Sequence, residues 1–242
     1  MRRLSLGWLR RNRRLQVGLL MLLPFVVFAI VPGLVAPHGA EELVSGVFKP
    51  PFGEYALGTD STGRDILSRL VFSAQTDLMI SLGSTAVAAV IGVAIGLLAG
   101  YWGGWPSALT LRVTDVMLAF PSILLALFLI TIVGRSDPII ILALATLFVP
   151  GFVRLARGLA LALRERAFVE SSVLSGGSAG YTVRRHLLPN AIGPLLVGFA
   201  LTAAYALLAA ATLSYLGLGP PPPAPSWGTM LQDAFGFPFR RA

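Results

Sequence analysis

Residues 170–190 read ESSVLSGGSAGYTVRRHLLPN, a polar, arginine-flanked stretch between two long apolar runs. Helices in compact bundles are usually joined by connections of about 2–8 residues. A basic connection of this length between apolar runs therefore predicts a surface on which another molecule docks. The runs on either side predict that the chain crosses a membrane several times.

Composition supports a polytopic membrane protein. The chain has 242 residues, of which 55% are hydrophobic and 12% are charged, whereas soluble domains carry roughly 25% charged residues. It contains no cysteine, which excludes a disulfide, a thiolate nucleophile and a Cys-ligated metal. Its two histidines, His38 and His186, lie far apart in the sequence, so no metal site is predicted.

The only lysine is Lys49, and it is followed by Pro50. A phosphate-binding loop requires Gly-Lys-Ser/Thr at its end, so the chain has no such loop. If ATP is used, another chain binds it.

Five apolar runs predict an all-α membrane protein, a bundle of five transmembrane helices. They lie at about 17–36, 78–100, 111–133, 139–155 and 191–216. The first run follows an arginine-rich start, which is also typical of a signal peptide. Its length of about 20 residues is enough to span a bilayer, which favours a retained helix.

The basic residues indicate the orientation. With the N-terminus in the cytoplasm, 13 of the 19 Lys and Arg residues fall inside and 8 of the 11 Asp and Glu residues fall outside. Lys and Arg are enriched in the cytoplasmic segments of membrane proteins. The net charge of +8 is therefore interpreted as topology and not as nucleic-acid binding.

Small residues recur every fourth position within 78–100. This spacing places them on one ridge of a helix, where they let another helix approach closely. The ridge consists of Ser84, Ala88, Gly92, Gly96 and Gly100.

Arg112 and Asp115 lie three positions apart at the cytoplasmic end of the run at 111–133, near the membrane interface. This spacing favours an ion pair between the two side chains. The alternative is that Asp115 lines a pathway, because carboxylates within membrane helices are often functional.

The segment 37–76 is polar and falls outside on this topology. Locally, its residues 57–65 predict a capped turn that leads into a helix, with Asp60 or Thr62 as the cap. The same residues read L-G-T-D-x-x-G-R-D. The specified positions after the first leucine are Gly58, Thr59, Asp60, Gly63, Arg64 and Asp65.

Three motifs together resemble the inner-membrane permeases of ABC importers, in the dipeptide, oligopeptide and nickel branch. The first is the E-A-A loop pattern, on which Glu170, Gly176, Leu188 and Pro189 fall, with Ser171 and Ser172 in place of two alanines. The second is the external string just described. The third covers Ser214–Gly219 and Pro225–Gly228. The external string is similar to that of the C-type subunit.

The resemblance implies a type I importer permease fold in a bacterial or archaeal inner membrane, with no catalytic residues of its own. It implies a homologous second permease subunit, two cytoplasmic ATPase subunits, an external substrate-binding protein, and contact with lipid but not nucleic acid. No cofactor is expected on this chain, since ATP and magnesium belong to the ATPases. Di- or oligopeptides are the expected cargo; nickel or another small solute is the alternative.

The resemblance also assigns the loop 158–190 to coupling with the ATPases. It implies a short helix at about 167–178, with Glu170 near its positive end and Gly176 or Gly177 ending it. Ser171 and Ser172 keep this helix narrow, and Pro189 starts the next membrane helix. The expected contact residues are Glu170, Ser171, Ser172, Gly176, His186, Leu188, Pro189 and Asn190.

The expected organisation is a basic N-terminal segment, 1–16, a first helix, 17–36, and an external segment, 37–76. A permease core, 77–234, and an atypical tail, 235–242, follow. The family's sixth helix is not found in this sequence, so a truncated, transport-incompetent permease is the alternative to an active one.

Two other classes fit less well. A secondary transporter would carry inverted repeats and broken helices with polar groups at mid-membrane, and no repeat is found. A membrane hydrolase needs a nucleophile beside a base, and neither histidine lies in a predicted membrane helix.

Overall fold

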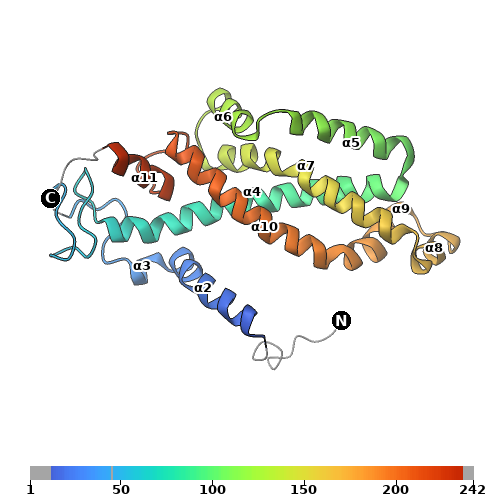
Figure 1. Ribbon diagram of the computed structural model, residues 1–242, viewed down its shortest axis with the longest axis horizontal. Helices are drawn as coiled ribbons and strands as arrows, with labels where there is room; N and C mark the ends of the chain where they lie inside the picture. The colour runs from blue at the N-terminus through green and yellow to red at the C-terminus, as the bar shows by residue number, and fades with distance from the viewer. Residues whose placement is uncertain (1–11, 45, 237–242) are drawn as a thin grey trace. The chain divides into compact units, whose positions relative to one another are not determined.

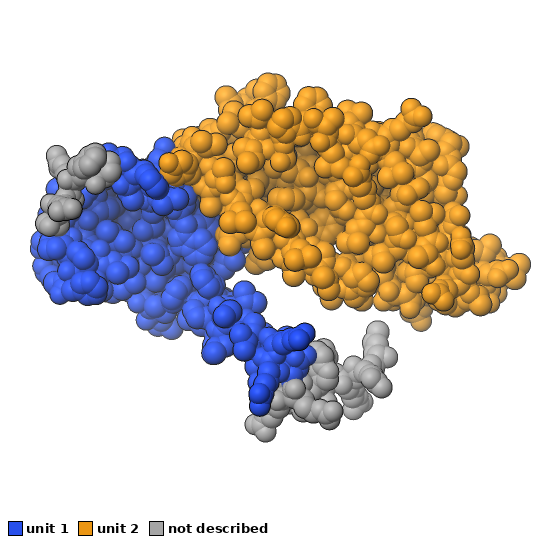
Figure 2. Space-filling view, viewed as in Figure 1, with its two compact units in different colours: residues 1–78, 222–242 blue, residues 79–221 orange. Residues whose placement is uncertain are grey.

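The computed structural model describes residues 12–44 and 46–236, and in this part of the chain every regular element is a helix. The all-α prediction is confirmed. Residues 1–11 of the expected N-terminal segment and 237–242 of the expected tail lie outside the described residues. The chain divides into two compact units, residues 1–78 with 222–242 and residues 79–221 (Figure 2).

The first unit begins with α2 (Arg13–Ile30), whose first turn is capped by Asn12. The helix ends at Val31, and Pro32 starts the short α3 (Pro32–Val35). Because a residue before proline is held out of the helical region, the expected single helix at 17–36 begins earlier and breaks at Val31. No residue of α2 is buried.

α4 (Ile66–Trp102) begins at Ile66, so the helix that was expected to start near residue 78 starts twelve residues earlier. The Asp65 carboxylate accepts hydrogen bonds from the backbone N–H of Ser68, at 3.0 Å, and from its hydroxyl. This is the geometry of an N-cap. The prediction that Asp60 or Thr62 caps this helix is therefore wrong; Asp60 binds the N–H groups of Thr62 and Arg64 instead.

The last element of the first unit is α11 (Trp227–Gly236). The Trp227 backbone N–H donates to Asp77 Oδ2 at 2.8 Å, and its indole N–H donates to the Leu70 carbonyl at 3.1 Å. Asp77, which the topology count placed among the external acids, is a fully buried residue of α4. It fixes the start of α11.

The second unit contains the remainder of α4 and the helices that follow it, which Figure 1 labels. These are α5 (Gly104–Ala119), α6 (Ser122–Val133), α7 (Asp137–Arg164), α8 (Ala167–Leu174), α9 (Ala179–Thr182), η1 (Val183–Leu187) and α10 (Leu188–Tyr215). The turn before α5 uses Gly103 and Gly104, both with positive φ.

The expected single helix at 111–133 is wrong. The chain forms α5 and α6, which meet at an angle of 83°. Phe120 and Pro121 occupy the break, and Phe120 is extended, with φ −82° and ψ 137°. A residue before proline disfavours the helical region, so the helix ends where Pro121 follows.

The small ridge of α4 lies against α7. Ser84, Ala88, Gly92, Gly96 and Gly100 are all buried. A Cβ added to Gly92 would lie 2.5 Å from the Phe152 Cβ; one on Gly96 would lie 2.8 Å from that of Ala156, and one on Gly100 2.5 Å from that of Ala160. The two helices therefore meet through residues spaced by four on both sides, a close approach that larger side chains would prevent.

The helix that was expected at 191–216 also starts earlier. α9, η1 and α10 follow one another over Ala179–Tyr215 without a break. Pro189 lies in the first turn of α10, as expected, and η1 continues the helical run ahead of it. In the described residues, four helices are long and apolar enough to cross a membrane, or five if α5 and α6 count as one broken span. This agrees with a multi-pass membrane protein.

Candidate functional site

The connection between α7 and α10 folds into a compact cap built around α8. Val169 is its anchor: it is 2% exposed and packs with Leu187 and Ala191 in an apolar cluster that also includes Ala156 and Ala160 of α7. Burial of a valine side chain contributes about 1.5 kcal/mol or more. Val169 therefore packs α8 against α7 and the start of α10.

The C-terminal end of α8 is set by Gly176, which has φ +79°. The Gly177 N–H donates to the Ser172 carbonyl at 2.9 Å, and the Gly176 N–H donates to the Val173 carbonyl at 3.0 Å. These paired bonds form a Schellman motif, which requires a left-handed residue and favours glycine there. Of the two glycines proposed to end the helix, Gly176 takes this position.

Two serines of α8 have different roles. Ser172 is buried, and its hydroxyl lies 3.1 Å from that of the buried Thr182 in α9. Ser171 is exposed and donates its hydroxyl to the Ala167 carbonyl at 2.8 Å. Ser172 therefore ties α8 to α9, while Ser171 stays on the outer surface as a small side chain.

His186 of η1 is half-buried between two aromatic rings. Its ring centroid lies 6.3 Å from that of Phe168 and 5.9 Å from that of Tyr181. Nearby, the Asn190 side-chain amide donates to the His186 carbonyl at 2.7 Å. Leu188 is half-buried and Pro189 is exposed. His186 and Asn190 therefore support the start of α10, whereas Glu170 and Ser171 lie on the exposed surface.

The outer surface of α8 carries a charged and an apolar group side by side. Glu170 is exposed in the first turn, where the helix dipole favours a carboxylate. Leu174 is 81% exposed and Val173 is 49% exposed. Glu170, Val173 and Leu174 therefore all lie on the outer surface of α8.

A hollow flanks α8 on each side. One is lined by Tyr101, Trp102, Arg164, Glu165, Val169, Glu170, Val173 and Leu174. The other is lined by Phe168, Ser171, Ser172, Ser175, Gly176, Gly177, Ser178, Tyr181 and His186. The helix therefore forms a ridge between two depressions.

The residues of the external motif hold together the loop ahead of α4. Thr59 is buried; its hydroxyl donates to the Gly46 carbonyl at 2.7 Å and accepts from the Lys49 N–H at 2.9 Å. Gly58 and Gly63 both have positive φ, 81° and 82°. A Cβ on Gly58 would collide with the Lys49 carbonyl. These residues shape the loop.

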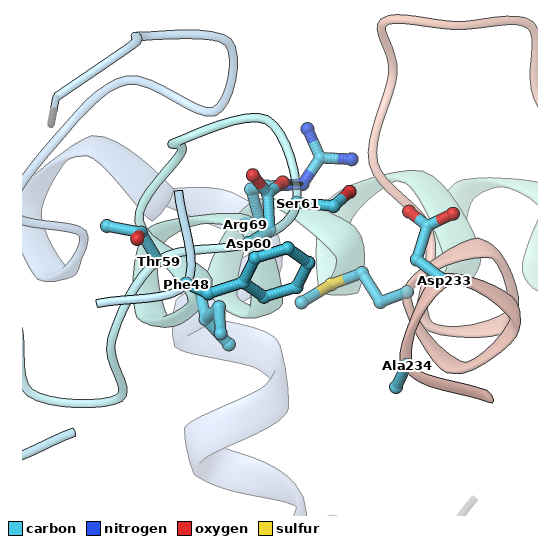
Figure 3. Close-up of a pocket in the computed structure, with 9 residues that line it drawn as sticks. Phe48, Thr59, Asp60, Ser61, Arg69, Asp233 and Ala234 are labelled. Atoms are coloured by element: carbon cyan, nitrogen blue, oxygen red, sulfur yellow. Dashed lines mark ion pairs between the residues drawn. The ribbon is translucent and has the colours of Figure 1, made fainter. Parts of the chain in front are cut away.

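Asp60 and Arg69 form an ion pair, with 3.6 Å between Oδ2 and Nε. Figure 3 shows them at a cavity of about 250 Å³ that α11 also borders, through Asp233. Burial alone would raise the pKa of Asp60, but hydrogen bonds from Arg64 and Thr62 and the charge of Arg69 outweigh it and lower the pKa. Burial raises the pKa of Asp233.

The predicted pairing of Arg112 with Asp115 is wrong. Asp115 of α5 forms an ion pair with Arg154 of α7, and the neighbouring Arg157 donates from Nε to the Ser107 hydroxyl at 2.6 Å. Sequence spacing favours partners on the same helix, so it missed this contact. An acid within one membrane helix and an arginine near the end of another were the available signals.

Comparisons with known proteins agree with these observations. The sequence pattern of a family described as the binding-protein-dependent transport system inner membrane component matches residues 92–239. The dipeptide transport system permease protein DppC of Alkalihalophilus pseudofirmus is 39% identical over 230 residues, which cover 95% of this chain and 76% of that protein.

Two further relatives have similar coverage. A putative peptide transport system permease protein of Brucella abortus is 38% identical over 92% of this chain and 75% of its own length. The glutathione transport system permease protein GsiD of Pectobacterium atrosepticum is 35% identical over 94% of this chain and 76% of its own length.

Proposed function

We propose that this chain, which belongs to the family of binding-protein-dependent transport system inner membrane components, imports short peptides and is coupled to ATP hydrolysis through α8. It is a permease subunit of an ABC importer and not itself an enzyme.

Peptides are proposed as the cargo because the three relatives are described as permeases for dipeptides, peptides and glutathione, and glutathione is itself a tripeptide. Their shared chemistry is a small solute with amide bonds and charged termini. None of these three is described as a nickel permease, so peptides are preferred to nickel as the proposed cargo.

The proposed partners are a second, homologous permease subunit, two ATPase subunits in the cytoplasm and an external substrate-binding protein. ATP and magnesium are proposed to bind the ATPases only. The proposed orientation places the N-terminus and α8 in the cytoplasm and the turn at Gly134 outside, as the distribution of arginines favours.

The observation that carries the coupling proposal is the construction of α8. Its inner side is fixed to the membrane helices by Val169 and Ser172, and its outer side presents Glu170, Val173 and Leu174. A ridge held in this way can transmit a push as a rigid body, because packed interfaces switch between discrete arrangements and do not deform continuously. Closure of the ATPases would move α8, and with it α7 and α10.

The test is the substitution Gly176→Leu. A leucine at φ +79° is strained by about 1–2 kcal/mol, and it would unwind the end of α8 that presents Leu174. We expect the variant to insert into the membrane and the assembled complex to hydrolyse ATP, while peptide uptake is lost.

The matched control is Gly193→Leu in α10, where an added Cβ meets nothing within 4 Å and φ is not positive. It adds the same side chain without the backbone strain, and uptake should persist. Normal uptake by the Gly176→Leu variant would refute the coupling role of α8.

A further inference from the structure

Helix α5 is attached to the rest of the second unit by polar contacts. Its buried residues are Ser107 and Thr114, and none of its apolar side chains belongs to an apolar cluster of the described residues. In contrast, α6 packs Ala126 and Ile130 in an apolar cluster with Leu144 of α7. The two helices of the broken pair are therefore held against α7 by different kinds of contact.

Two arginines of α7 contact side chains of α5, which runs beside it (Figure 1). Arg157 is half-buried and donates from Nε to the Ser107 hydroxyl at 2.6 Å. Because Ser107 is 2% exposed, this bond lies where the two helices meet. About one turn earlier, Arg154 forms its ion pair with Asp115. An exposed ion pair contributes little by itself, so the less exposed contact of Arg157 is the stronger attachment.

A third arginine of α7 reaches the turn that begins α5. An added Cβ on Gly103 would lie 2.4 Å from Arg164 Nη1, so the guanidinium occupies the place that a side chain would take at that turn. At about 100° per residue, Arg154, Arg157 and Arg164 project within an arc of about 80° around α7. One side of α7 therefore contacts α5 along most of its length.

The arginines lead directly to the candidate coupling surface. Arg164 ends α7, and only Glu165 and Arg166 separate it from α8. Arg164 also borders the hollow beside α8 that Glu170 and Val173 line. A displacement of α8 can therefore reach α5 through the side chains of α7.

We propose that Arg154, Arg157 and Arg164 are positioning residues that carry α5 along with α7 when α8 is displaced. The inference rests on the proposed function for the origin of that displacement. Its physical basis is direction: charge-assisted hydrogen bonds hold donor and acceptor in a narrow geometry, whereas packed helices can slide past one another in shear. A helix held at these points keeps its register on α7.

The test replaces the contact of Arg157 with a removable covalent link. The chain has no natural cysteine, so Ser107→Cys with Arg157→Cys introduces one thiol on each helix. Without a link, we expect this variant to take up dialanine about fivefold more slowly than the natural complex, the lower end of coupling between sites. A bifunctional methanethiosulfonate that joins the two thiols should restore uptake, and a reductant that cleaves the link should remove the gain.

The ATP consumed for each dialanine taken up separates positioning from folding. A variant that only folds less well loses uptake and ATP hydrolysis in proportion, whereas loss of positioning raises the ATP consumed per dialanine. Gly158→Cys is the matched control, because it lies beside Arg157 and an added Cβ there meets nothing within 4 Å. Treated with the same reagent, it should keep the natural ratio.

Three results would overturn the inference. Natural uptake by the unlinked variant would mean that transport does not need the contact of Arg157. Uptake that stays low or falls further on linking would mean that α5 does not travel with α7. A natural ratio of ATP to dialanine in the unlinked variant would mean that the contact is structural only.

Hydrogen exchange tests the attachment of α5 independently of the cargo. In the purified complex, the amides of residues 104–119 should exchange faster in the unlinked variant than in the natural chain, while those of residues 122–133 should not. Equal exchange in 104–119 would also overturn the inference. Faster exchange as expected, combined with no dialanine uptake by the natural complex, would reject the proposed cargo and leave the attachment of α5 standing.

Discussion

Single residues in this chain act mainly through backbone conformation and close approach. Gly176 adopts a φ that L-residues rarely take, and Gly92, Gly96 and Gly100 leave room for the backbone of α7. Asp65 caps α4, and Asp77 holds the first N–H of α11. These residues position the backbone. Among the acids outside the candidate membrane spans, Asp60 ahead of α4 and Asp233 in α11 have shifted pKa values.

Asp60 predicts how the external segment responds to acid. Its pKa is lowered in the folded state from an ordinary value of 3.8. A carboxyl with a lowered folded pKa contributes stability that is present above the unfolded pKa and is lost as the pH falls through the folded pKa. We therefore expect the first unit to lose stability below about pH 4.

Asp233 contributes with the opposite sign, because burial raises its pKa in the folded state. The comparison is therefore between the natural chain and Asp60→Asn, with the thermal midpoint measured from about pH 6 to about pH 3. The natural chain should show the steeper decline. Parallel curves would mean that the hydrogen bonds from Thr62 and Arg64 do not stabilise the Asp60 carboxylate.

At the scale of elements, sequence patterns predicted which segments are helical better than where those helices begin and end. The apolar run at 111–133 conceals a break, because hydropathy does not register the constraint that Pro121 places on Phe120. Conversely, α4 extends outward beyond its apolar run to Ile66, since Asp65 caps it and buried polar residues such as Ser68 and Ser73 continue the helix.

In the candidate site, too, the sequence predicted single positions better than contacts between elements. The Glu, Gly and Pro positions of the loop could be found in the sequence, because they fall on the loop pattern of the family that the chain resembles. The buried contact between Ser172 and Thr182, the rings around His186 and the pair of Asp115 with Arg154 could not. Each joins two elements, and the distance between elements is decided by packing.

The contact between Ser172 and Thr182 predicts how firmly α8 is held. Replacing Ser172 with Ala leaves the fully buried Thr182 hydroxyl without this partner, which should cost about 1–3 kcal/mol. Hydrogen exchange in residues 167–176 should then accelerate.

The double variant, Ser172→Ala with Thr182→Val, removes both polar groups and should recover much of the protection, because replacing both partners is nearly neutral. The contrary result is a double variant that loses as much exchange protection as the losses of the two single variants added together. That result would mean that the hydroxyl pair does not fix α8 to α9.

Across the whole molecule, coupling through α8 is possible in only one orientation of the chain in the membrane. α8 must lie in the cytoplasm with the ATPases, and the turn before α7 must lie outside. The absence of natural cysteines permits a direct measurement with two isosteric changes, Ser175→Cys beside α8 and Ser136→Cys before α7.

In intact cells with the outer membrane permeabilised, a membrane-impermeant maleimide should label Ser136→Cys and leave Ser175→Cys unmodified. In inverted vesicles the pattern should reverse. The positive-inside distribution of arginines is the reason for this expectation. The opposite pattern would place α8 outside and remove it from the ATPases.

Contact between α8 and an ATP-hydrolysing subunit can be tested by photo-crosslinking from Leu174, which is 81% exposed at the end of α8. A photoreactive amino acid at this position, in the complex in its native membrane, should give a crosslink to an ATPase subunit identified by mass spectrometry. The same probe at Leu201, 60% exposed in the middle of α10, should not. Crosslinks from position 174 to lipid alone, or to no ATPase, would contradict the account.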